Sequence, residues 1–222
     1  MSITTIIGPM FSGKTTEFIR LVDRKKIAGK RCLIIKHIRD DRFEKNDSEE
    51  KHIITHNQIR YKNCDIVYSN NLFNSNFFEL VITNYDVVGV EEGFFFDDVA
   101  IFCNELANNN IEVIVSTIDS SFKQEIFQEI GKLIAISENV IKLKAVCMKC
   151  KINDASFTIR TVDNDNEILV GGSDIYQSVC RNCLNKNRSD KKENKILGKR
   201  KKIETNQCAK SNLLCNKLTK MI

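Results

Sequence analysis

The sequence lacks any apolar run near the ~18 residues that a membrane-spanning helix requires. We expect no secretory leader either, because Met1-Ser2-Ile3 runs straight into a β-branched, strand-like segment. We therefore expect neither a membrane protein nor a secreted one. Without a leader, the nine cysteines are better interpreted as thiols or metal ligands than as a disulfide framework.

Most of the chain lacks an excess of positive charge, although the net charge is +5. Residues 184–222 hold 12 Lys and Arg against 3 Asp and Glu, whereas the first 183 residues hold 22 against 26. An acidic body without interleaved aromatic and basic side chains does not indicate a nucleic-acid groove. Hydrophobic residues make up 42% of the chain, which is enough for a folded core and excludes wholesale disorder.

Strand and helix patterns alternate along the first two thirds of the chain, which predicts an α/β fold with a parallel sheet flanked by helices. Residues 1–144 would form this domain, 145–184 a small cysteine-rich domain, and 185–222 a basic, disordered tail. The polar stretch 40–51 is predicted to be a mobile loop. Buried strands are predicted at 3–7, 31–36, 86–90 and 111–116, and helices at 15–28 and 97–108.

A phosphate-binding loop is predicted where the first strand passes into the first helix. The stretch GPMFSGKT fits the pattern GxxxxGK[ST], in which glycines let backbone N–H groups face phosphate oxygens. The lysine would neutralise the β- and γ-phosphates, and the threonine hydroxyl would bind Mg²⁺. The alternative is a chance glycine-rich turn. The ATP-binding candidates are Gly8, Pro9, Met10, Phe11, Ser12, Gly13, Lys14 and Thr15.

Two adjacent acids, Glu91 and Glu92, follow the predicted strand 86–90 at the edge where open α/β sheets bind ligands. One carboxylate could reach the metal shell, and the other could accept a proton from an attacking hydroxyl. The alternative is a solvated acidic turn. The phenylalanines at 94–96 count against it, because they must be buried or cover a flat surface.

Two Cys-x-x-Cys pairs, separated by 29 residues, predict a tetrahedral zinc site with four thiolate ligands. No coordination position stays open in such a site, so the zinc would be structural. Cys32, Cys64 and Cys103 lack this spacing and are interpreted as packed thiols. The zinc ligands are predicted to be Cys147, Cys150, Cys180 and Cys183.

Seven motifs in order give the chain, from about residue 3 to 184, a resemblance to the thymidine kinases of the cellular and poxviral type, type II. The motifs are GPMFSGKTTE at 8–17, CLIIKHIRDDRF at 32–43, TH at 55–56, VGVEEGFFFDD at 88–98, IVSTIDSSF at 114–122, KLKAVCMKC at 142–150 and VGGSDIYQSVCRNC at 170–183.

The resemblance implies a RecA-like P-loop domain with a zinc-binding lasso domain, which transfers the γ-phosphate of Mg-ATP to the 5′-hydroxyl of thymidine. It implies that Glu92 is the general base, that Glu91 and Thr15 belong to the Mg²⁺ shell, and that Arg42 reaches the phosphates. Phe122 matches the aromatic residue that stacks on thymine. The substrate-binding residues that it implies are Met10, Phe95, Phe122, Glu167, Ile168, Leu169, Val170, Gly171 and Tyr176.

The same resemblance implies a cytoplasmic homotetramer, in the host cytoplasm if the protein is viral, that dTTP inhibits and that needs neither nucleic acid nor a membrane. The sequence departs from the family pattern at several positions near the predicted site. Glu91 replaces an Asp, Phe94 a Gln, Ser120 a Gly, Lys123 a Gln and Ile126 a Pro.

Two other functions are carried as alternatives. A P-loop ATPase could act on nucleic acid, with the cysteine pairs as a zinc ribbon and the tail as a phosphate-binding arm. A non-catalytic relative could bind ATP or dTTP without turnover. In the tail, the basic run 199–202 could be a nuclear signal or a polyanion-binding patch, or simply solvated, and KEN at 192–194 could be a degradation tag.

Overall fold

The computed structural model describes residues 1–39, 53–54, 60–162 and 169–189. Within the chain, Met1–Cys180 form one compact unit and Arg181–Ile222 a second. The predicted mobile loop, the TH motif and the tail from 190 onwards lie outside the described residues, whereas 185–189, expected to be disordered, belong to a helical segment over 181–189. None of the described helices is long and apolar enough to cross a membrane.

A six-stranded sheet forms the centre of the first unit, in the order β5-β2-β6-β7-β1-β8, and every neighbouring pair is parallel. This confirms the predicted fold class and the four predicted strands. Those four are buried on both faces, as their continuous runs of Val, Ile and Leu require. The strands are β1 (Ile3–Gly8), β2 (Cys32–His37), β5 (Asp65–Ser69), β6 (Val87–Val90), β7 (Glu112–Ile118) and β8 (Asn139–Lys142).

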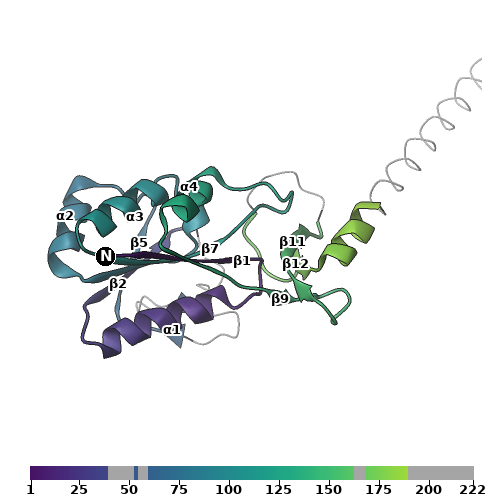
Figure 1. The fold of residues 1–222 in the computed structure, drawn as a ribbon, viewed down its shortest axis with the longest axis horizontal. Helices are drawn as coiled ribbons and strands as arrows, with labels where there is room; N and C mark the ends of the chain where they lie inside the picture. The colour runs from purple at the N-terminus through teal and green to yellow at the C-terminus, as the bar shows by residue number, and fades with distance from the viewer. Residues whose placement is uncertain (40–52, 55–59, 163–168, 190–222) are drawn as a thin grey trace, which may run out of the picture. The chain divides into compact units, whose positions relative to one another are not determined.

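Helices cover both faces of the sheet, with α1 on one face and α2, α3 and α4 on the other (Figure 1). Phe18 and Val22 of α1 pack on Ile6, Ile34 and Ile114 of the sheet. On the opposite face, Phe102 and Leu106 of α3 and Leu133 of α4 join a separate core with the other sides of the same strands. The helices are α1 (Lys14–Ile27), α2 (Ser75–Asn84), α3 (Val99–Asn108) and α4 (Gln128–Ile136), with a 3₁₀ turn η1 at Gly93–Phe95.

Three short antiparallel strand pairs in the described residues lie outside the six-stranded sheet. Within the segment 145–180, β9 (Ala145–Val146) pairs with β10 (Asp154–Ala155), and β11 (Phe157–Arg160) pairs with β12 (Tyr176–Val179). A third pair joins β3 (Ile53–Ile54) and β4 (Arg60–Tyr61). The strands of the segment 145–180 are therefore short and antiparallel.

Candidate active site and metal centre

The loop after β1 turns into α1 through two glycines that adopt positive φ. At Gly8 (φ 154°), an added Cβ would lie 2.7 Å from the carbonyl oxygen of Leu143, so a side chain does not fit. Gly13 (φ 81°) is the N-cap of α1, which begins at Lys14. The structure therefore has the strand, loop and helix order that a phosphate-binding loop requires, with the N-terminus of α1 directed at the loop.

Polar contacts inside this loop hold its shape. The buried Lys14 ammonium and the Ser12 hydroxyl each donate to the carbonyl oxygen of Pro9, both at 2.8 Å. The backbone N–H of Met10 donates to the Thr158 hydroxyl of β11 at 3.0 Å. The phosphate loop is thus attached to the strand pair that follows the sheet in the chain, within the same compact unit.

The two acids after β6 are buried, so the interpretation as a solvated turn is wrong. Glu91 is 3% exposed and Glu92 8%. A carboxylate oxygen of Glu91 lies 3.8 Å from the Lys36 ammonium of β2. Glu92 has a left-handed backbone (φ 52°, ψ 50°), which is uncommon for a residue with a Cβ and which occurs in clusters at functional sites. The next residue, Gly93, lies so close to Val115 that an added Cβ would be 2.9 Å from it.

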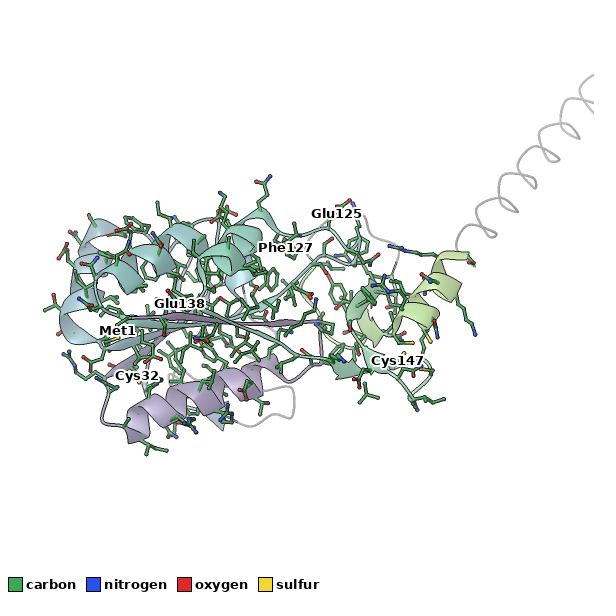
Figure 2. The ribbon with its side chains drawn as sticks, viewed as in Figure 1. Met1, Cys32, Glu125, Phe127, Glu138 and Cys147 are labelled. Atoms are coloured by element: carbon green, nitrogen blue, oxygen red, sulfur yellow. The ribbon has the colours of Figure 1, made fainter. Side chains whose placement is uncertain are left out.

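The three phenylalanines at 94–96 differ in their burial and in their ring contacts. Phe96 is fully buried and meets the His37 ring edge-on, with 4.8 Å between centroids. Phe95 is half-buried and stacks on the same imidazole at 5.3 Å. Phe94 packs beside Phe127, which Figure 2 labels next to α4, at 5.5 Å. His37, at the end of β2, is therefore buried against Phe95 and Phe96. The sequence alone did not indicate a role for this histidine.

A second aromatic group surrounds Phe122, in the loop after β7. The guanidinium carbon of Arg160 lies 3.9 Å from the centre of the Phe122 ring, and Arg160 is 2% exposed. Arg160 also donates to the Tyr176 hydroxyl, which donates in turn to the Leu169 carbonyl oxygen. The structure thus brings together three predicted substrate-binding residues, from the loop after β7, from β12 and from the segment before it.

Sequence reasoning missed Arg160, because a single arginine in a short strand looks like a solvent-facing residue. Of the other predicted residues, Val170 is exposed and Gly171 partly exposed. Arg42, Glu167 and Ile168 lie outside the described residues.

The four predicted zinc ligands form a cluster in which all four sulfur atoms lie within 4.8 Å of one another. Burial raises the pKa of the Cys147 thiol, but backbone N–H donors around it outweigh burial and lower that pKa to about 6. The pKa of Cys150 is also lowered, chiefly by backbone donors from Ile152 and Asn153. A compact set of four thiols, of which Cys147 and Cys150 have a lowered pKa, fits the tetrahedral thiolate site that zinc prefers. Cys147 follows β9 (Figure 2).

The three other cysteines in the described part of the chain are packed thiols, as predicted. Cys32 and Cys103 are buried, and Cys64 is half-buried. Burial raises the pKa of all three thiols, that of Cys64 to about 11. No disulfide joins cysteines within the described part of the chain.

Comparison with known proteins identifies the family in which this combination of phosphate loop, buried acids and cysteine cluster occurs. The family described as thymidine kinase matches residues 1–184. The chain belongs to the thymidine kinase family.

Proteins named thymidine kinase are similar to this chain over most of its length. The thymidine kinase of Acanthamoeba polyphaga mimivirus is 66% identical over 185 residues, which are 83% of this chain and 82% of that protein. The thymidine kinase of Choristoneura biennis entomopoxvirus is 42% identical over 85% of this chain and 99% of its own. Thymidine kinase 1 of Dictyostelium discoideum is 40% identical over 85% of this chain and 79% of its own. The family implies a kinase that uses ATP, in place of an ATPase that acts on nucleic acid.

Proposed function

We propose that this chain transfers the γ-phosphoryl group of ATP to the 5′-hydroxyl of thymidine, with thymidylate and ADP as products. The observation that carries the proposal is Glu92, a buried acid in a left-handed backbone at the carboxyl end of β6. Since β1 and β6 both pair with β7 in parallel, Glu92 and the phosphate loop leave the sheet at the same edge.

The phosphate loop would bind the triphosphate of ATP. Backbone N–H groups of residues 8–15 would face the phosphate oxygens, and the Lys14 ammonium would move from the Pro9 carbonyl to the β- and γ-phosphates. Thr15 and Glu91 would hold Mg²⁺, and Arg42 would contact the phosphates. When bound, the ion neutralises charge that develops between the β- and γ-phosphates.

Glu92 would act as the general base. As the 5′-oxygen of thymidine forms a bond to the γ-phosphorus, the bond from that phosphorus to the β-bridging oxygen breaks, and ADP leaves with the electron pair. The hydroxyl proton passes to the Glu92 carboxylate. A closed site around the buried Glu92 would keep water away from the phosphoryl group, which would favour transfer over hydrolysis.

The base would be recognised by stacking and by main-chain contacts. Phe122 would stack on the thymine, with Met10 and Phe95 beside it. The segment 167–171, with Tyr176, would bind the base edge, and the Tyr176–Leu169 hydrogen bond supports this assignment. The domain boundaries near 144 and 184 belong to the same proposal.

The cysteine cluster would hold a structural Zn²⁺ ion that stabilises the segment carrying Tyr176, which precedes Cys180 by one short strand. Thiolate ligands persist under reducing conditions, so a cytoplasmic location accompanies the proposal. We further propose a homotetramer and inhibition by dTTP, which shares its base with the acceptor and its triphosphate with the donor. Gel filtration with light scattering, and inhibition kinetics against thymidine, test these two points.

The central test is transfer of labelled γ-phosphate from Mg-ATP to a panel of deoxyribonucleosides. We expect thymidylate from the native chain and a loss of at least ~10²-fold in kcat for Glu92→Gln, because the variant cannot accept the proton. Glu79→Gln, an exposed position on α2, is the control and should be unchanged. ATP binding without transfer to any nucleoside would overturn the proposal in favour of a non-catalytic nucleotide-binding protein.

A further inference from the structure

Arg160 is a cation buried among the residues of the proposed base site. Its guanidinium is stacked over the Phe122 ring at 3.9 Å and lies 5.3 Å from the centre of the Tyr176 ring. One of its terminal nitrogens donates to the Tyr176 hydroxyl at 2.8 Å. Burying a charge is unfavourable unless its contacts compensate for the lost hydration, so these contacts must hold the guanidinium in place.

The contacts fix two parts of the site at once. Arg160 and Tyr176 are direct partners across the β11–β12 pair, which sets the position of both side chains from the backbone. From there, the guanidinium reaches Phe122 in one direction, and the Tyr176 hydroxyl reaches the Leu169 carbonyl oxygen in the other, at 2.8 Å. One side chain therefore connects the stacking ring to the main chain at 169.

The guanidinium also determines which part of the Phe122 ring a ligand can use. A planar guanidinium stacks on an aromatic face, and the electron-rich face attracts its charge. Because Arg160 is 2% exposed while Phe122 is only half-buried, the face under Arg160 is closed and a flat ligand must stack on the rest of the ring. Lys123, whose ammonium lies 5.6 Å from the ring centre, is a second and exposed cation at this ring.

We propose that Arg160 is a positioning residue that orients Phe122 and the 169–171 main chain together for a flat pyrimidine base. The inference rests on the proposed function, because it deepens the base site named there. Arg160 acts through Phe122 and Tyr176 and is not placed in contact with the phosphates. Loss of Arg160 should consequently raise the KM for thymidine and leave the KM for ATP nearly unchanged.

The experiment compares Arg160→Met, Arg160→Lys and the control Arg24→Met, which lies on the exposed side of α1. KM is measured separately for thymidine and for ATP, together with zinc content and thermal midpoint. We expect Arg160→Met to raise the thymidine KM roughly tenfold, as loss of a desolvated cation–π contact implies, and to leave the ATP KM within about twofold. Arg160→Lys should recover part of the loss, because it keeps the charge but loses the planar fork.

Two outcomes would overturn the inference: a thymidine KM that Arg160→Met leaves unchanged, or equal rises in both KM values with a lower thermal midpoint. If Arg160→Met does not fold, Tyr176→Phe keeps the ring, removes the hydroxyl and should still raise the thymidine KM selectively. Thymidine binding, measured by calorimetry, separates this inference from the proposed function. Binding that depends on Arg160 without phosphoryl transfer supports the inference and overturns the function, whereas turnover indifferent to Arg160 does the reverse.

Discussion

At the residue scale, the two acids after β6 differ in their surroundings although they are adjacent in the chain. Glu91 lies beside the Lys36 ammonium, and the side chains of this pair are 4% and 6% exposed. Glu92 stands instead at the start of the 3₁₀ turn η1, in a left-handed conformation. Glu91 is therefore part of a buried ion pair as well as a candidate for the Mg²⁺ shell, while the left-handed backbone sets Glu92 apart as the candidate base.

This pair gives a stability prediction. Glu91→Gln should lower the free energy of unfolding by about 3 kcal/mol, because it removes the carboxylate beside a buried ammonium without changing the size of the side chain. Urea denaturation, followed by circular dichroism, measures the change.

The matched control is Glu112→Gln in the Lys25–Glu112 pair, which is closer, at 2.6 Å, but more exposed, with side chains 20% and 36% accessible. An exposed pair contributes about 0.5 kcal/mol. Equal losses in the two variants would show that burial does not set the contribution of the Lys36–Glu91 pair.

At the scale of elements, one hydrogen bond joins the phosphate loop to β11, from the Met10 backbone N–H to the buried Thr158 hydroxyl. Thr158→Val keeps the shape of the side chain but removes this acceptor. Leaving a fully buried donor without a partner costs about 1–3 kcal/mol, and the Met10 N–H is partly buried, so the cost here should fall near the lower value. We expect roughly tenfold weaker binding of a non-hydrolysable ATP analogue, by calorimetry, because the loop no longer has its fixed position.

Thr158→Ser is the control for that experiment, since it retains the hydroxyl and should bind the analogue within about twofold of the native chain. Equal affinity in Thr158→Val would mean that the loop holds its shape through its own contacts, chiefly those of Ser12 and Lys14 to Pro9.

The elements that sequence reasoning predicted are those whose pattern is local. Continuous β-branched runs at β1, β2, β6 and β7 indicate strands buried on both faces, and the glycine pattern indicates the phosphate loop. The edge strands β5 and β8 were not predicted, because an edge strand is partly exposed and its residues alternate irregularly: Asn139, Val140 and Lys142 of β8 are exposed.

The contacts that complete the candidate site could not be predicted in this way, because they join residues far apart in the chain. Arg160 stacks on Phe122, 38 residues earlier in the chain, and Lys36 reaches Glu91 from a neighbouring strand. Nothing in the local sequence of either cation distinguishes it from an exposed lysine or arginine. Only the spacing of the cysteine pairs predicts a long-range contact, since four thiolates can bind one ion only if the two pairs lie together.

At the scale of the whole molecule, charge and family membership divide the chain at nearly the same place. The family match ends at residue 184, and the excess of basic residues lies beyond it. Every residue proposed here for phosphate, base or metal binding precedes this division. The basic segment is therefore expected to affect contacts with polyanions and not phosphoryl transfer itself.

A chain ending at Ser189 tests this expectation. Its kcat and its KM values for thymidine and ATP should stay within about twofold of the full chain, because no group proposed for the reaction is removed. The segment 190–222 carries 10 Lys and Arg against 3 Asp and Glu, so the shortened chain becomes net acidic and should elute from a heparin column at clearly lower salt. A large fall in kcat with an unchanged thermal midpoint would instead place part of the catalytic machinery in the basic segment. Unchanged heparin retention would assign polyanion binding to the body, despite its excess of acidic residues.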